Sequence, residues 1–97
     1  MNDKLPIKYK VEISDDVVSR NLQGEVVLLN LKTGSYYSLD STGTKMWELI
    51  QEYKSFEKVL ELLLKEYDIS EAQCREDLLN FISTLEEKEL IKGLIEV

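Results

Sequence analysis

The spacing of apolar residues changes once along this chain, near Asp40, and this change constrains the fold more than any other feature. Before Asp40, β-branched residues, leucines and tyrosines form short runs separated by turn-forming pairs, Gln23-Gly24 and Thr33-Gly34. Such runs predict three strands in a meander. After Asp40 the apolar residues recur at helical spacing. The sequence therefore predicts an α+β fold, with a three-stranded antiparallel sheet followed by three helices.

The third predicted strand, Ser35–Leu39, comes last in the meander, so one of its edges has no predicted partner. Tyr36 and Ser38 are expected to face one side of the sheet, and Tyr37 faces the other with Ser35 and Leu39. The strand contains neither proline nor charge, two features by which proteins block exposed edges. An edge that is not blocked accepts an added strand. In the strand before it, Val27, Leu29 and Leu31 are expected to share one face, with Val26 and Leu28 on the other.

Three helices are predicted after the meander, the first beginning near Ser41 and the others covering residues 56–67 and 70–88. Asp40, Ser55 and Ser70 are residue types found at helix starts. The second and third helices form a helix-turn-helix pair, so the whole arrangement resembles a winged helix. The third helix has an apolar stripe that predicts its core face: Cys74, Leu78, Phe81, Ile82 and Leu85.

The chain length of 97 residues is that of one domain. Residues 1–16 contain the only proline and are interpreted as an N-terminal arm or edge segment, followed by a single domain at residues 17–97. Residues 89–97 are predicted to form an extended tail that returns to the sheet, bending at Gly93. No apolar run reaches the roughly 18 residues of a membrane span, and the N-terminus lacks a signal-peptide pattern. We therefore expect a cytoplasmic protein without a membrane partner.

The chain is acidic, with 12 basic and 19 acidic residues and a net charge of −7. A field of this sign repels phosphate backbones. A winged-helix DNA-binding regulator stays open as an alternative, because the helix-turn-helix pair is present. However, Ser70–Lys88, which would enter the major groove, has five acids and two bases, whereas phosphate contacts need lysine and arginine. Nucleic acid is not an expected partner.

Composition also disfavours an enzyme. The chain has no histidine, the commonest general base and transition-metal ligand. Cys74 lies on the predicted core stripe and is interpreted as structural. The acidic pairs Asp15-Asp16, Glu76-Asp77 and Glu86-Glu87 are adjacent residues, which do not face each other on a helix, so they are interpreted as solvated surface. We expect no catalytic residue, no metal and no cofactor.

The segment Val26–Ile50 resembles the PqqD-like proteins, also called RiPP recognition elements, which bind the leader region of ribosomally made peptides awaiting modification. The resemblance continues more loosely to Ile91, and two features depart from the family: Glu89 stands where members often have glycine, and the N-terminal arm has no family pattern. The matching positions are Asn30, Thr33-Gly34, Tyr36-Tyr37, Leu39, Gly43, Trp47, Asp77-Leu78, Phe81-Ile82 and Leu85.

The resemblance implies that the leader adds as an antiparallel strand beside Ser35–Leu39 and lays side chains into a groove between that strand and the third helix. Arg75 is expected to pair with a leader carboxylate, whereas core packing is the competing role for Leu78 and Ile82. The implied peptide-binding residues are Ser35, Tyr36, Tyr37, Ser38, Leu39, Arg75, Leu78, Leu79 and Ile82.

The function implied by the resemblance is that of a non-catalytic adaptor. It captures a precursor peptide by its leader and delivers it to a separate modifying enzyme, such as a radical-SAM protein, a leader peptidase or a cyclase. A dimerisation module is a further alternative, because the same open edge could pair with a second copy in a homodimer. The product stays open among a quinone cofactor, a lasso peptide and a thioether-bridged peptide.

Overall fold

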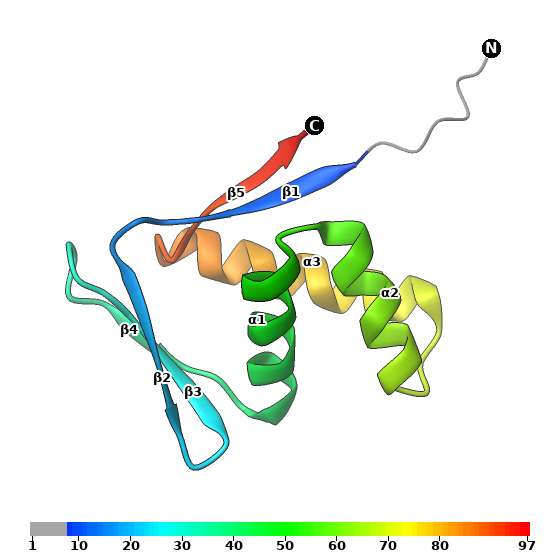
Figure 1. Ribbon diagram of the computed structural model, residues 1–97, viewed down its shortest axis with the longest axis horizontal. Coiled ribbons are helices and arrows are strands. Elements are labelled where there is room, and N and C mark those ends of the chain that lie inside the picture. Colours follow the sequence, from blue (N-terminus) through cyan, green and yellow to red (C-terminus); the bar gives the residue numbers. More distant parts are fainter. Residues whose placement is uncertain (1–7) are drawn as a thin grey trace.

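A computed structural model describes residues 8–97 of the protein (Figure 1). Strands β2, β3 and β4 form a three-stranded antiparallel sheet, and three helices follow it in the chain. The predicted α+β fold is therefore confirmed. In chain order the elements are β1 (Tyr9–Ile13), β2 (Val17–Leu22), β3 (Glu25–Asn30), β4 (Tyr36–Ser38), α1 (Ser41–Tyr53), α2 (Phe56–Glu66), α3 (Glu71–Glu87) and β5 (Ile91–Glu96).

The sheet follows the predicted meander closely. Gln23 and Gly24 make the β2–β3 turn with φ angles of 56° and 90°, and a two-residue hairpin turn with two positive φ angles matches the twist of its strands. Alternation along β3 buries Val26 and Leu28. Leu31 departs from the expectation, because β3 ends at Asn30 and Leu31 lies in the following turn with 62 % of its surface exposed.

Each helix begins at a predicted capping residue. The side chains of Asp40, Ser55 and Ser70 each accept a hydrogen bond from the backbone N–H three positions later. These bonds satisfy one of the unpaired N–H groups of each first turn. The predicted helix starts are therefore confirmed, and only Leu39 and Asp40 separate β4 from α1.

The C-terminal tail is extended as predicted, but its partner differs from the expected one. β5 pairs antiparallel with β1 in a second, two-stranded sheet and not with β2–β4. β1 is available for this pairing because Val11 is fully buried in the core and donates its N–H to the C=O of Lys54 at 2.9 Å. Residues 1–7 of the predicted arm, including Pro6, lie outside the described residues. The boundary at residue 17 stays a prediction.

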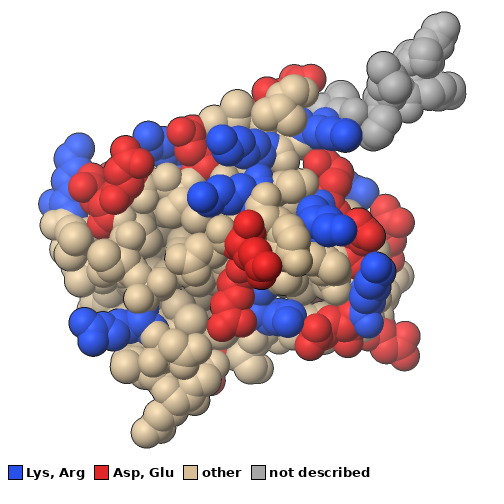
Figure 2. Space-filling model, viewed as in Figure 1, with Lys and Arg blue, Asp and Glu red and all other residues tan. Residues whose placement is uncertain are grey.

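The core lies between the sheet and the three helices. Trp47 of α1 is only 1 % exposed, and residues from β1, β3, all three helices and β5 surround the same apolar cluster. Figure 1 shows β2–β4 at one end of the molecule, the helices at the other and the β1–β5 ribbon along one side. In Figure 2, charges of both signs cover the helical end, whereas the β2–β3 hairpin is largely uncharged. Within residues 8–97, no helix is both long and apolar enough to span a bilayer.

Candidate functional site

β4 lies at the edge of the three-stranded sheet, and no strand within residues 8–97 pairs with its outer side. On its inner side, the C=O of Ser35 and the N–H of Leu39 bond to β3 at 2.9 and 2.8 Å. Bonded and non-bonded residue pairs alternate along an antiparallel ladder. The N–H and C=O groups of Tyr36 and Ser38 therefore point away from β3, so the open edge offers two donors and two acceptors.

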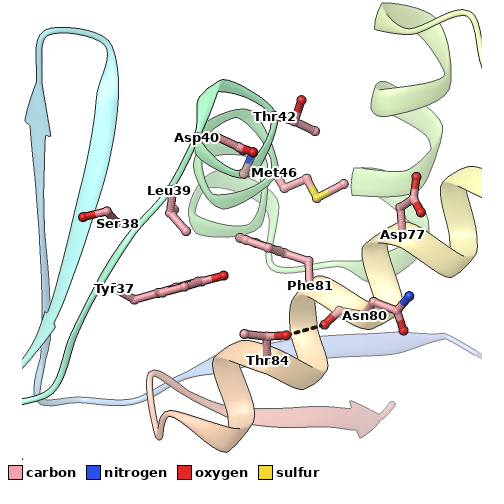
Figure 3. Close-up of a pocket in the computed structure, with 11 residues that line it drawn as sticks. Tyr37, Ser38, Leu39, Asp40, Thr42, Met46, Asp77, Asn80, Phe81 and Thr84 are labelled. Atoms are coloured by element: carbon pink, nitrogen blue, oxygen red, sulfur yellow. Dashed lines mark hydrogen bonds between the residues drawn. The ribbon is translucent and has the colours of Figure 1, made fainter.

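A groove of about 380 Å³ lies between β4, the start of α1 and α3 (Figure 3). Tyr37 and Leu39 line it from the strand side, and Phe81 of α3 points toward them across the groove. The α3 residues follow the i, i+3, i+4, i+7 spacing of one helix face. The residues that line the groove are Tyr37, Ser38, Leu39, Asp40, Thr42, Gly43, Met46, Asp77, Asn80, Phe81 and Thr84.

Two buried side chains tie the walls of the groove together. Thr44 of α1 accepts the N–H of Val26 at 2.9 Å. Asn30 donates through Nδ2 to the C=O of Glu89 at 2.7 Å, which connects the end of β3 to the end of α3. Its Oδ1 accepts two backbone N–H groups of the β3–β4 turn. Because Asn30 is 3 % exposed and both polar atoms of its side chain are hydrogen-bonded, it holds the turn before β4 at a set position relative to α3.

The strand residues predicted for the site divide between two faces. Tyr37 and Leu39 line the groove with their side chains, whereas Ser38 borders it with its side chain directed away (Figure 3). Tyr36 projects from the opposite face with 70 % of its surface exposed, so only its backbone belongs to the open edge. The Ser35 hydroxyl is paired with the Thr33 hydroxyl in the turn, at 2.8 Å.

The Tyr37 ring also contacts a cationic side chain. Its ring lies 4.9 Å from Nζ of Lys88, a cation–π contact at the C-terminal end of α3. This contact holds the ring at the end of the groove nearest the β3–β4 turn. The sequence had not indicated this role for Lys88, because the two residues are distant in the chain.

The helix residues predicted for the site lie outside the groove. Leu78 and Ile82 are core residues, 0 % and 3 % exposed. Arg75 pairs with Glu71 at 3.0 Å, and with Leu79 it lines a separate shallow surface. Arg75 and Leu79 each stand two positions before a groove residue, and residues two positions apart point about 200° apart around a helix. Their surface therefore faces away from the groove.

The groove face of α3 was missed from the sequence and consists of polar residues around one aromatic. Phe81 had been assigned to the core stripe, and Asp77, Asn80 and Thr84 had not been assigned to the site. Phe81 is instead half-buried at the groove. The usable signal was the flank of the core stripe opposite Arg75, where Asp77 and Thr84 lie beside Phe81 on the helix. The members of this face are Asp77, Asn80, Phe81 and Thr84.

Cys74 has the environment of a structural residue. It is 3 % exposed, and burial, followed by the nearby Asp77 carboxylate, raises the pKa of its thiol. Both effects disfavour the thiolate, the form that acts as a nucleophile. Among residues 8–97, no three His, Cys, Asp or Glu side chains come together as a metal-binding group.

The comparisons with known proteins bear directly on this geometry. Residues 25–91 match the family described as coenzyme PQQ synthesis protein D (PqqD). The chain belongs to the PqqD family. The matched range runs from the start of β3 to the start of β5, so it contains the β4 edge and the whole groove. The resemblance seen in the sequence is thereby confirmed.

Two solved structures share the fold of this PqqD-family protein. TbiB1 in complex with the TbiA(beta) leader peptide is 40 % identical, with a TM-score of 0.81, and the match covers 84 % of this chain and 95 % of that chain. Lasso peptide synthetase B1 complexed with the leader peptide is 18 % identical, with a TM-score of 0.76 and coverage of 84 % and 96 %. The second likeness concerns the fold alone. The comparison with curated proteins found no match.

Proposed function

We propose that this PqqD-family protein binds the leader region of a ribosomally made precursor peptide and delivers it to a separate modifying enzyme. The observation that carries the proposal is the open β4 edge directly beside the groove on α3. An extended peptide needs both features, because backbone bonds to an edge give affinity and pockets for alternate side chains give selectivity. TbiB1, which shares 40 % identity, was solved with a leader peptide, and this supports the proposal.

The peptide runs antiparallel to β4 and bonds to the backbone of Tyr36 and Ser38. Its alternate side chains enter the groove over Leu39, Met46 and Phe81, which are buried or half-buried apolar residues. The remaining side chains face outward beside Tyr36. The groove therefore reads the apolar residues of the leader at every second position.

The adaptor role requires no chemistry from this chain. Holding the leader makes the encounter between the precursor and the enzyme nearly intramolecular, with an effective concentration on the order of millimolar for a short tether. The enzyme that receives the peptide is a radical-SAM protein, a leader peptidase or a cyclase. Because such precursors are made by ribosomes, we place the protein in the cytoplasm.

Proline at position 38 tests strand addition. Ser38→Pro removes an N–H that points to the open edge and leaves the ladder to β3 unchanged. We expect it to weaken binding of the leader encoded beside this protein at least about 10-fold, the effect of losing one backbone hydrogen bond and adding a steric block. Isothermal titration calorimetry measures the affinity, and Ser38→Ala, which keeps the N–H, is the control.

The matched pair separates backbone from side-chain effects. Ser38→Ala should bind the leader as the wild type does. If Ser38→Pro retains the wild-type circular dichroism spectrum and also the wild-type affinity, peptide addition to β4 is wrong. Light scattering of the free protein tests the dimerisation alternative, because it measures the molar mass. A dimer held through β4 would compete with the leader for the same edge.

A further inference from the structure

A second hollow, of about 320 Å³, continues the groove beyond the C-terminal end of β4. It shares Thr42, Met46 and Asp77 with the first groove, so the two form one path along the protein surface. Its other lining residues come from α2, from the connection between α2 and α3, and from α3: Leu63, Tyr67, Asp68, Ile69 and Cys74.

The walls of this hollow are apolar and its charged groups are all acidic. Leu63 and Met46 are buried, Tyr67 and Ile69 are half-buried, and two carboxylates, those of Asp68 and Asp77, lie beside them. A lysine or arginine side chain has the matching form, because an aliphatic stem packs on apolar walls while the charged head reaches carboxylates. Among the described residues, no lysine or arginine lines either hollow.

Two lysines next to lining residues of this path are already engaged. Lys45 of α1 pairs with Glu66 at 3.4 Å. Lys88 contacts the Tyr37 ring at the opposite end of the groove. Asp77 accepts a hydrogen bond from Gln73 at 2.8 Å through one carboxylate oxygen, which leaves the other oxygen for a ligand. The path therefore has the positive charge of Lys88 at one end and negative carboxylates at the other.

We propose that the second hollow binds a lysine or arginine side chain of the same leader peptide. The inference rests on the proposed function and adds to it a charge requirement. It also sets the position of the cation in the peptide. The hollow lies beyond the C-terminal end of β4, and an antiparallel partner has its N-terminal end there. The basic residue therefore precedes the segment that pairs with β4.

Charge scanning of the leader tests this inference. The probe is the leader encoded beside this protein, synthesised as a set in which each position in turn carries lysine or glutamate. Fluorescence anisotropy measures the affinity of each peptide. We expect one position, N-terminal to the segment that pairs with β4, where lysine binds roughly 10-fold more tightly than glutamate. The preference should fall below about 2-fold for the double variant Asp68→Asn/Asp77→Asn.

The control is Asp15→Asn/Asp16→Asn, which changes net charge equally in the β1–β2 turn, away from the hollow. It should retain the preference for lysine. If the leader binds but no N-terminal position prefers lysine, or if the preference persists in Asp68→Asn/Asp77→Asn, the inference is wrong while the proposed function stands. If the unaltered leader does not bind the wild-type protein, the proposed function fails and this inference fails with it.

Discussion

Glu89 adopts a left-handed backbone with φ of +60°, directly after the C-terminal cap of α3. Glycine is the residue that fits this position, because it has no Cβ to clash with the backbone. The sequence had marked Glu89 as a departure from the family, where glycine is common, and the structure gives the physical meaning of that departure. The hydrogen bond from Asn30 to the C=O of Glu89 holds the strained residue in place.

Glu89→Gly should therefore stabilise the protein. We expect the free energy of unfolding to rise by about 0.5–1 kcal/mol, because relief of the left-handed strain exceeds the entropy that glycine adds to the unfolded chain. Urea denaturation measures the change. The control is Glu87→Gly, two positions earlier in the last turn of α3, where glycine should cost about 1 kcal/mol. Equal losses at both positions would show that Glu89 is not strained.

Helix α3 has faces in three different environments. Leu78 and Ile82 face the core, Phe81 faces the groove, and Arg75 lies on a separate surface beside Glu71. Helical periodicity identifies the core stripe, but each flank of that stripe is equally compatible with a binding surface. Packing against β4 and α1 selects the flank that carries Phe81.

Two alanine substitutions on α3 distinguish the flanks. Phe81→Ala should weaken leader binding at least about 10-fold, since a half-buried aromatic wall of the groove is lost. Arg75→Ala should leave the affinity within about 2-fold, because its contacts are an exposed pair with Glu71 and the Phe56 ring. Calorimetry with the encoded leader measures both. A large loss for Arg75→Ala alone would return the site to the flank first predicted from the sequence.

At the scale of the whole molecule, the β1–β5 ribbon joins both described ends of the chain to the helical core. Val11 of β1 is completely buried, and Ile91 at the start of β5 is 2 % exposed. Because β5 pairs with β1, it adds no fourth strand to the β2–β4 sheet. β4 therefore keeps an open edge in the part of the chain that the structure describes. The pairing of the tail with β1 is thus part of what keeps the candidate site accessible.

Val11→Ala tests whether the ribbon unfolds together with the rest of the protein. The loss of two buried methyl groups and the cavity left behind should lower the free energy of unfolding by about 2 kcal/mol. Lys10→Ala, the exposed neighbour in the same strand, should change it by less than about 0.5 kcal/mol. Chemical denaturation compares them. An unchanged stability for Val11→Ala would mean that the ribbon opens independently and that residue 17 is an energetic boundary.

Local patterns in the sequence predicted the three-stranded meander and the three helices in their order. Alternating runs, a positive-φ turn at Gln23-Gly24 and side-chain caps such as Asp40 act over a few residues, so their signals are local and were read correctly. The PqqD-like segment from Val26 to Ile50 also identified the family. The third strand was predicted as an edge because it ends the meander, which is again a matter of chain order.

Contacts between elements that are distant in the chain set which residues share the groove. The choice between Phe81 and Arg75 depends on the rotation of α3 about its axis, which is set by packing against α1 and β4. The pairing of β5 with β1 depends on where Val11 enters the core, some 80 residues away in sequence from its partner Leu94. Local spacing carries no information on either, because both are contacts between segments that the chain brings together only when the core closes.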